Sequence, residues 1–313
     1  MKDEAIKHII DRYNLNEIVD ILSNKLSGSE LNSLLLEVFE RRVMQETPSS
    51  LLGKYTKNKL VKPAQLDFLK FKEEELECCK IVANSSFELI ELSPVAQLGT
   101  SSIMATVNQK KVLTALRNTE VQSDPTNSIA LHYASLKKNN ELSEKTYNFS
   151  NVSRVIRTQV FSNPNFTPHF PILCLISCGM DTGSFEFEKT EIHKHFAITQ
   201  DVCKSVFGFN NLFFEIIPCK EYDSNSPLIS NSLSHIKNSG FDVRIAESDS
   251  QNNYYYGMRI KVKIIADGVE YEIGDGGLLD WTQKLLANKK ERMLTMGLGI
   301  QLLHLFRKQY VDI

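Results

Sequence analysis

The sequence predicts an α+β fold, in which an antiparallel sheet is flanked by helices and follows a small helical appendage. Three observations predict it. From residue 64 onwards, short apolar runs with a period of two recur, as in strands. Asp267-Gly268 separates two of these runs, as in a tight hairpin. Residues 1–62 instead place apolar residues at helical spacing. Strands joined by hairpins, with helices on one side, indicate an antiparallel α+β architecture.

The composition is that of a globular chain without an overall basic field. The chain has 313 residues, 42% hydrophobic and 24% charged, with a formal net charge of −2, so no general attraction to nucleic acid is expected. No apolar stretch approaches a membrane span, and residues 1–4 lack the apolar core of a signal peptide. Six cysteines, none in a CxxC pair, indicate a reducing, cytoplasmic compartment. We expect no structural metal.

We expect two regions, a helical region over residues 1–62 and a larger domain over residues 63–313. In the first, Ser27 and Glu30 have the spacing of a capping box. Apolar stripes at helical spacing lie on either side of it, over residues 5–13 and 31–43. The simplest interpretation of this region is a packing or interface element.

The elements of the larger domain follow in order from periodicity and turn residues. Helices are expected over residues 66–83, 125–136, 186–207, 228–240 and 296–310. Strands are expected over residues 87–92, 102–107, 112–117, 155–161, 171–178, 212–218, 243–247, 257–265 and 269–273. Residues 138–149 are polar and are expected to form a loop.

Three glycine-rich or aromatic segments near the end of the chain predict a cleft for a small ligand. Tyr254-Tyr255-Tyr256-Gly257 opens an alternating strand, residues 274–280 are interpreted as a glycine-lined turn, and residues 296–300 as a Gly-x-Gly helix start. Because glycine has no side chain, backbone lined by it can approach a ligand closely.

In residues 66–313 these motifs resemble the class II aminoacyl-tRNA synthetases, most of all the histidyl-tRNA synthetase core and its regulatory-subunit paralogues. The resemblance implies a class II synthetase-like antiparallel sheet flanked by helices. A long helix, a strand and a proline over residues 73–94 match the first family motif. In the family this motif forms the dimer interface, so the resemblance implies a homodimer.

The second and third motifs imply a nucleotide site. Arg157 stands where the family holds the ATP α-phosphate, and Phe170 where it stacks on adenine. Gln159 replaces a usual acid. Gly297 and Gly299 match the glycine-rich start of the third motif. An arginine fork neutralises phosphate charge, and the family uses ATP with Mg²⁺.

Further segments imply an amino-acid site. Asp124 and Thr126 match the residues that bind the α-amino group, Tyr255 lies in the run that lines the amino-acid pocket, and Gly276-Gly277 begins a matching glycine motif. Leu302 and Leu278 stand where the family has arginines that bind its substrates.

Structural interpretations compete with these roles. Asp124 could be only a helix N-cap, Arg157 a surface ion pair, and the tyrosine run ordinary strand residues. His193 and His195 point to different helix faces and predict no metal site. Residues 289–292, which include two lysines and Arg292, are typical of a solvated face, with an RNA or anion contact as the alternative. His169 is interpreted as a loop histidine.

The replaced arginines favour a paralogue that binds an amino acid or nucleotide without charging tRNA, as a sensor or regulatory protein. No anticodon-binding domain is expected after residue 313. The alternative is an active, ATP-dependent ligase that makes an aminoacyl-AMP for tRNA or another carrier. A third interpretation is a purely structural dimeric partner. Binding of tRNA or other RNA is left open. Walker, HExxH, GxSxG and dinucleotide-binding motifs are missing from the sequence.

Overall fold

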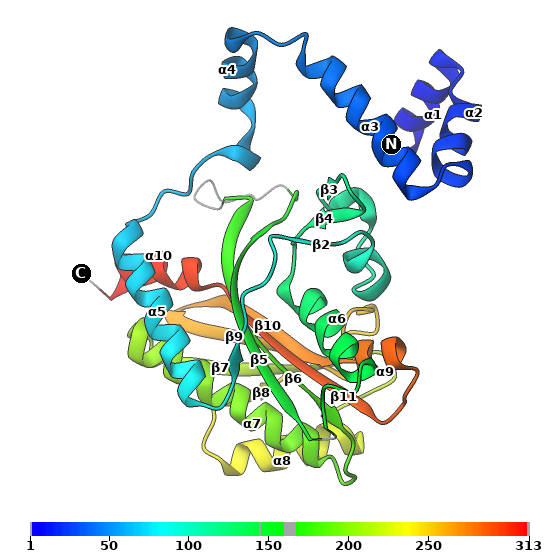
Figure 1. The fold of residues 1–313 in the computed structure, drawn as a ribbon. Helices are drawn as coiled ribbons and strands as arrows, with labels where there is room; N and C mark the ends of the chain where they lie inside the picture. Colours follow the sequence, from blue (N-terminus) through cyan, green and yellow to red (C-terminus); the bar gives the residue numbers. More distant parts are fainter. Residues whose placement is uncertain (1, 144, 160–166, 312–313) are drawn as a thin grey trace.

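A computed structural model describes residues 2–143, 145–159 and 167–311. Its centre is an eight-stranded sheet with the order β1-β5-β6-β11-β10-β9-β7-β8 (Figure 1). Neighbouring strands are antiparallel except at the two edges, where β1 pairs with β5 and β7 with β8 in parallel. The strands are β1 (Glu88–Leu89), β5 (Tyr147–Ile156), β6 (His169–Met180), β7 (Leu212–Pro218), β8 (Val243–Ile245), β9 (Met258–Ala266), β10 (Val269–Leu279) and β11 (Glu291–Leu298).

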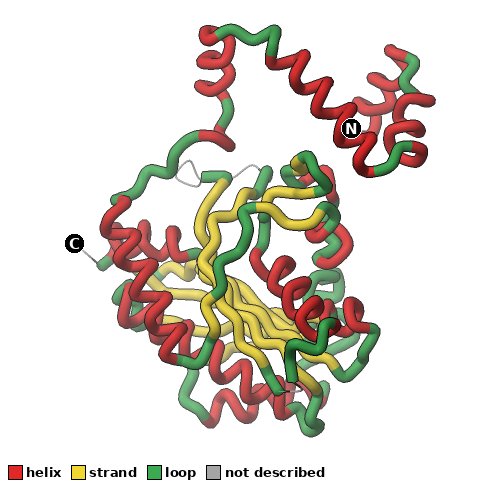
Figure 2. Tube along the Cα trace, in the orientation of Figure 1, coloured by secondary structure: helices red, strands yellow, loops and turns green. Residues whose placement is uncertain are grey.

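Helices cover both faces of this sheet, as Figure 2 shows. One face packs against α5 (Phe68–Asn84), α7 (Glu186–Asp201), α8 (Pro227–Asn238) and α10 (Ile300–Tyr310). The other face packs against α6 (Pro125–Lys138) and α9 (Trp281–Leu286). Strand β6 shows why there are two cores: Leu173 and Leu175 belong to the first, whereas Ile172 and Cys174 belong to the second. Alternate side chains of a strand point to opposite faces.

Smaller elements complete the chain. A three-stranded sheet has the order β2-β4-β3, with β2 at Val95–Gln97, β3 at Thr114–Ala115 and β4 at Thr119–Val121. Short π- and 3₁₀-helical segments lie at Ile21–Lys25, Lys59–Val61, Thr100–Met104, Gln109–Lys111 and Val202–Val206. None of the helices in the described residues is long and apolar enough to cross a membrane.

The first region contains α1 (Lys2–Tyr13), α2 (Asn16–Asp20), α3 (Gly28–Val43) and α4 (Pro48–Lys57). Figure 1 shows these helices projecting beyond the sheet, away from the two cores. The capping box at the start of α3 is confirmed, with reciprocal bonds between Ser27 and Glu30. The boundary between the two regions, placed at residues 62 and 63, stays a prediction.

The α+β class, the antiparallel sheet and the helical start are confirmed, but several local predictions are wrong. Residues 102–107 are not a strand, because a π-helical turn occupies Thr100–Met104. Of residues 112–117, only Thr114–Ala115 forms a strand. The expected loop over residues 138–149 ends early, since β5 begins at Tyr147. Of the strand expected over residues 155–161, only residues 155–156 belong to β5, residues 157–159 are not a strand, and residues 160–161 lie outside the described residues.

The glycine-rich segments are strands. Residues 274–279 continue β10 and do not turn, and residues 291–298 form β11, whereas a helix start was predicted at residue 296. Helix α10 begins only at Ile300, after Gly299. The glycines of β10 let this strand pack closely against β11: a Cβ on Gly276 would lie 2.2 Å from the carbonyl oxygen of Thr295.

Candidate functional site

A cavity of about 590 Å³ opens on the sheet face that carries α6. Its floor comes from β6, β10 and β11, and its walls come from the end of β5, the start of α6 and the segment before β9. The residues that carry its polar groups include Lys111, Ser123, Asp124, Thr126, Asn127, Arg157, Thr158, Gln159, Asn252, Tyr254, Tyr255, Arg259, Glu272, Asp275 and Thr295. The volume is in the range of small-molecule sites.

Eight of the ten residues predicted for the site lie around this one cavity. They are Asp124, Thr126, Arg157, Gln159, Phe170, Tyr255, Gly297 and Gly299. The cavity lining does not include Gly276 and Gly277, because both are packed inside the sheet. A Cβ on Gly277 would lie 2.7 Å from the ring of Tyr255 and 2.3 Å from the carbonyl oxygen of Met258. Their role is therefore close strand packing.

Asp124 is the N-cap of α6 and also borders the cavity, and its binding of an amino group stays a prediction. As N-cap of α6 it accepts a hydrogen bond from the Thr126 backbone N–H at 3.0 Å. Its second oxygen accepts from the Tyr254 hydroxyl at 2.7 Å. Burial and the neighbouring Asp124 charge raise the pKa of Tyr254 well above its usual value, so this hydroxyl stays protonated. Both contacts are made by neutral donors, so neither supplies a positive charge to the Asp124 carboxylate.

Beyond the cap, the floor of the cavity carries small polar groups. The Thr126 hydroxyl lies 3.1 Å from the Thr295 hydroxyl and 3.4 Å from Cys174 Sγ. Burial raises the pKa of the Cys174 thiol to about 12. The thiol is therefore neutral at physiological pH and acts as a small apolar group in the floor.

Arg157 lies just after β5, and its guanidinium faces the same cavity. Its Nε donates to the Ser123 carbonyl oxygen over 3.4 Å, and its guanidinium carbon lies 5.5 Å from the centre of the Phe170 ring. The next residue, Thr158, donates to the Lys111 carbonyl oxygen at 2.6 Å. This bond ties the Gln109–Lys111 turn to the end of β5, so two cationic residues border one part of the cavity.

Four charged residues of the cavity were not predicted, namely Lys111, Arg259, Glu272 and Asp275. Arg259 of β9 donates to Oδ2 of Asp275 from Nη2 at 2.8 Å and from Nε at 3.2 Å, and its Nη2 lies 3.5 Å from Glu272. Desolvation raises the pKa of Asp275, although Arg259 and the more distant Arg157 oppose the rise. The strict alternation of β9 could have indicated Arg259. Asp275 was hidden because residues 274–280 were interpreted as a turn.

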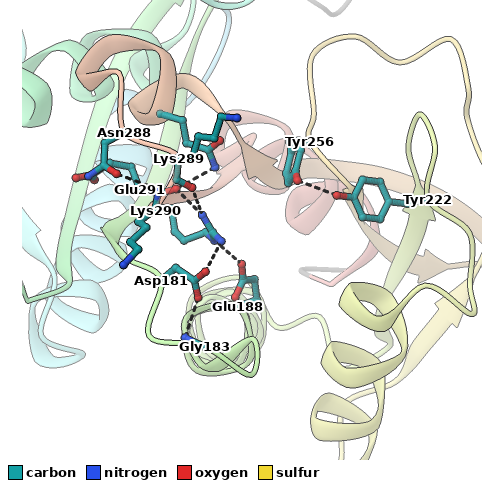
Figure 3. A network of polar contacts seen from close by, with 11 residues as sticks. Asp181, Gly183, Glu188, Tyr222, Tyr256, Asn288, Lys289, Lys290 and Glu291 are labelled. Carbon is teal, nitrogen blue, oxygen red and sulfur yellow. Dashed lines mark hydrogen bonds and ion pairs between the residues drawn. The ribbon is translucent and has the colours of Figure 1, made fainter.

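Arg292, at the start of the central strand β11, belongs to a separate polar network. Its guanidinium binds Asp181 at 2.6 Å and Glu188 at 3.1 Å. Figure 3 shows these two carboxylates, with Lys289, Lys290 and Glu291, around the network, and the Tyr222–Tyr256 hydroxyl bond of 2.7 Å beside it. The interpretation of residues 289–292 as a solvated face is therefore wrong for Arg292, which makes two ion pairs and is only 22% exposed.

The cavity offers no obvious metal-binding set. Within residues 2–143, 145–159 and 167–311, no group of three or more His, Cys, Asp or Glu side chains is arranged to hold a metal ion. The carboxylates of Glu272 and Asp275 lie in the cavity wall, but both accept from Arg259. The donor set present therefore fits charged organic groups better than a bound ion.

Comparisons with known proteins show a shared fold at low sequence identity. Neither a protein-family model nor a curated protein matches the sequence. The structure of apo histidyl-tRNA synthetase from S. aureus matches 82% of this chain and 71% of its own, with a TM-score of 0.62 and 13% identity.

Two further structures agree. An ATP phosphoribosyltransferase regulatory subunit/histidyl-tRNA synthetase from Bacillus halodurans C matches 78% of this chain and 82% of its own, with a TM-score of 0.60 and 13% identity. A histidine–tRNA ligase subunit from Alicyclobacillus acidocaldarius matches 81% and 97%, with a TM-score of 0.58 and 9% identity. These likenesses confirm the expected fold.

Proposed function

Because the chain shares the fold of the class II aminoacyl-tRNA synthetase catalytic core, we propose that its cavity binds an amino acid or nucleotide without charging tRNA. The observation that carries the proposal is a pair of uncompensated charges. Asp124 and Arg157 line one cavity, and no oppositely charged side chain of the described residues lies within ion-pair distance of either.

Uncompensated charges in a partly desolvated cavity raise the free energy of the empty protein, unless a ligand supplies the missing partner. An ammonium group satisfies Asp124, and a carboxylate or phosphate satisfies Arg157. A ligand with both groups is an amino acid or an activated form of one. The phenyl ring of Phe170, next to Arg157, offers a stacking surface for a base.

Binding without turnover is favoured by what surrounds these two charges. Leu302 lines the cavity, and a leucine cannot donate a hydrogen bond to phosphate. Leu278, the second replacement of a family arginine, is buried in the first core. A regulatory or sensing role is consistent with the presence of a regulatory subunit among the proteins of similar fold.

The alternative is an active ligase that uses ATP and Mg²⁺ to form an aminoacyl-AMP. One observation favours it: Lys111 also borders the cavity, on the turn that Thr158 ties to Arg157. A second cation beside Arg157 could take the place of a lost phosphate-binding arginine. Pyrophosphate release that depends on one amino acid would identify this activity.

A thermal-shift screen of the purified protein tests the proposal. The probes are the twenty amino acids, ATP and AMP with Mg²⁺, singly and in pairs. A probe at about 100 times its dissociation constant adds about 2.7 kcal/mol to the free energy of unfolding. We expect one probe or pair to raise the melting temperature of the wild type, and Asp124→Asn and Arg157→Ala each to abolish the shift.

Asparagine is as good an N-cap as aspartate, so Asp124→Asn removes the charge and keeps the cap. The matched control is Asp223→Asn, an exposed turn aspartate that accepts backbone N–H groups from Asn225 and Ser226. This control should keep the full ligand shift. If no probe stabilises the wild type, or if both cavity variants keep the shift, the proposal is wrong.

A further inference from the structure

The helices of residues 2–62 expose an unusual share of the apolar side chains of the molecule. Twenty-six large apolar side chains are exposed in the described residues, and sixteen of them lie in this first fifth of the chain. Helices α2, α3 and α4 contain no buried residue. Contiguous exposed apolar surface on a folded protein marks an interaction site.

Helix α3 presents the broadest part of this surface. Its apolar residues cover one side of the helix, and at a period of 3.6 they span more than half of its circumference. They are Leu31, Leu34, Leu35, Leu36, Val38, Phe39 and Val43. Its opposite side carries Ser33, Glu37, Glu40 and Arg41, and Arg41 pairs with Glu37 at 2.6 Å. The polar side chains are therefore satisfied by water and by their own ion pair. On the apolar side Leu31 and Leu35 are half-buried, and the other five side chains are exposed.

Two other helices also expose apolar side chains. Helix α4 exposes Leu51, Leu52 and Tyr55. Helix α5 packs its inner face into the first core and exposes Phe68, Leu69 and Leu76 on its outer face. Leu69 and Leu76 are seven residues apart and lie on the same side of the helix. One chain thus carries two uncovered apolar surfaces, one on the appendage and one on the larger domain.

The charges of the appendage argue against an acidic partner. Residues 1–62 contain ten Lys and Arg against nine Asp and Glu. Several of these charges are already neutralised within the appendage, at Lys25–Asp20, Arg41–Glu37 and Lys54–Glu46. A nucleic acid or an anionic membrane would require a basic patch. The surface therefore fits an apolar protein partner.

We propose that the apolar face of α3 and α4 is covered by a second copy of this chain, in a two-fold contact that includes the outer face of α5. The area matches this occupant. Nine exposed side chains lie between Leu34 and Tyr55. A half-exposed large side chain offers on the order of 90 Å² of accessible surface, so these nine together offer roughly 800 Å². Each partner of a stable dimer buries about this area.

A two-fold contact requires the same surface on both copies, and the uncovered α5 face supplies a second apolar surface for the partner's appendage. This contact shares Leu76 of α5 with the dimer implied by residues 73–94, but it differs from that dimer because it also needs the apolar side chains of residues 34–55. It is also independent of whether the cavity binds a ligand.

Sedimentation-velocity measurements on the full chain test the proposal over a range of concentrations. The test variant is Phe39→Asp with Leu52→Asp. Because a dimer would bury two unpaired carboxylates per chain, we expect its dissociation constant to rise by about 100-fold or more, which is about 2.7 kcal/mol. Both residues are exposed in the single chain, so its circular dichroism should match that of the wild type.

The control is Val269→Asp, which places the same charge at an exposed position of the β9–β10 hairpin. It should dimerise as the wild type does. A wild type that stays monomeric would overturn the proposal and leave the surface to a different protein. A dimer that persists in the test variant would place the contact elsewhere in the chain and would overturn it equally.

Discussion

At the scale of single residues, His195 is the clearest case of a group held in one protonation state. Its Nε2 lies 2.9 Å from the Ser177 hydroxyl, which donates to Glu191. Its Nδ1 has no hydrogen-bond partner among the described residues. Burial, helped by the Lys194 charge, lowers the pKa of His195 from 6.5 to about 3. The imidazole is therefore neutral in the folded protein.

This shift predicts a loss of stability in mild acid. Below pH 6.5 the unfolded chain binds a proton at His195, whereas the folded chain does not until about pH 3. His195 therefore does not affect the free energy of unfolding above about pH 7. Between pH 6.5 and pH 3 that free energy falls as the pH decreases, and the loss between pH 7.5 and pH 5 is about 2 kcal/mol. Urea denaturation at the two pH values measures it.

His195→Gln should lower the difference between the two pH values by this amount. His193→Gln, on the same helix, is the matched control and should keep the wild-type difference. Equal pH dependence in wild type and His195→Gln would contradict the assignment.

The cavity residues show how far sequence reasoning reached at this scale. Asp124 and Arg157 were found because each lies in a motif, and the fold brings them to one cavity. Arg259 matches no motif, and its contact with Asp275 runs diagonally between two paired strands, since Arg259 faces Gly277 and Asp275 faces Lys261. A contact of this kind between two strands can be predicted only when the strand boundaries are predicted correctly. Because residues 274–280 were predicted to be a turn, the contact between Arg259 and Asp275 was missed.

At the scale of elements, the glycines of β10 set how closely the central strands pack. A Cβ on Gly276 would lie 2.2 Å from the Thr295 carbonyl oxygen and 2.9 Å from Met296 Cα. Both atoms belong to the backbone of the central strand β11, so moving them would disturb the pairing of the sheet. We predict that Gly276→Ala destabilises the larger domain by at least about 2 kcal/mol, measured by denaturation followed through Trp281, the single, buried tryptophan.

Gly53→Ala provides the comparison. Gly53 lies in α4, and no other atom would lie within 4 Å of the added methyl group. Alanine has the higher helix propensity, by up to about 1 kcal/mol. This variant should leave the Trp281 transition unchanged. Equal stability of Gly276→Ala and wild type would show that the strands can separate more easily than their contacts imply.

Strand β11 explains why sequence reasoning failed for this part of the sheet. Six of its eight residues are buried, because it lies between β6 and β10 with helices on both sides. A strand buried on both faces has no alternation, and a short apolar run of this kind cannot be distinguished from a helix by period. By contrast, β9 alternates strictly, and its position was predicted to within one residue.

At the scale of the whole molecule, a buried network joins two helices far apart in the sequence. Glu74 of α5 accepts from His304 of α10 at 2.6 Å and lies 3.3 Å from Arg307. Glu74 and His304 are both buried. Removal of one partner from a buried charged network leaves the others uncompensated. We expect Glu74→Ala to lower the free energy of unfolding by about 3 kcal/mol, by the same Trp281 measurement.

Glu77→Ala is the matched control. Glu77 lies one turn further along α5, where it pairs with Lys80 in solvent. Exposed pairs of this kind contribute less than about 1 kcal/mol. If both variants lose the same stability, the Glu74 network contributes no more than a surface ion pair.

The order of strands has a consequence for how the protein is made. Strand β11 is the last of the described strands to leave the ribosome, yet it lies in the middle of the sheet and alone joins β5-β6 to β10-β9-β7. Until it arrives, the nascent chain holds two unjoined half-sheets with unpaired edges, which are prone to aggregation. The cavity spans this seam, since Thr295 and Gly297 of β11 form part of its floor. A small molecule can therefore occupy the complete cavity only after β11 has been made, and cannot assist the folding steps that come before it.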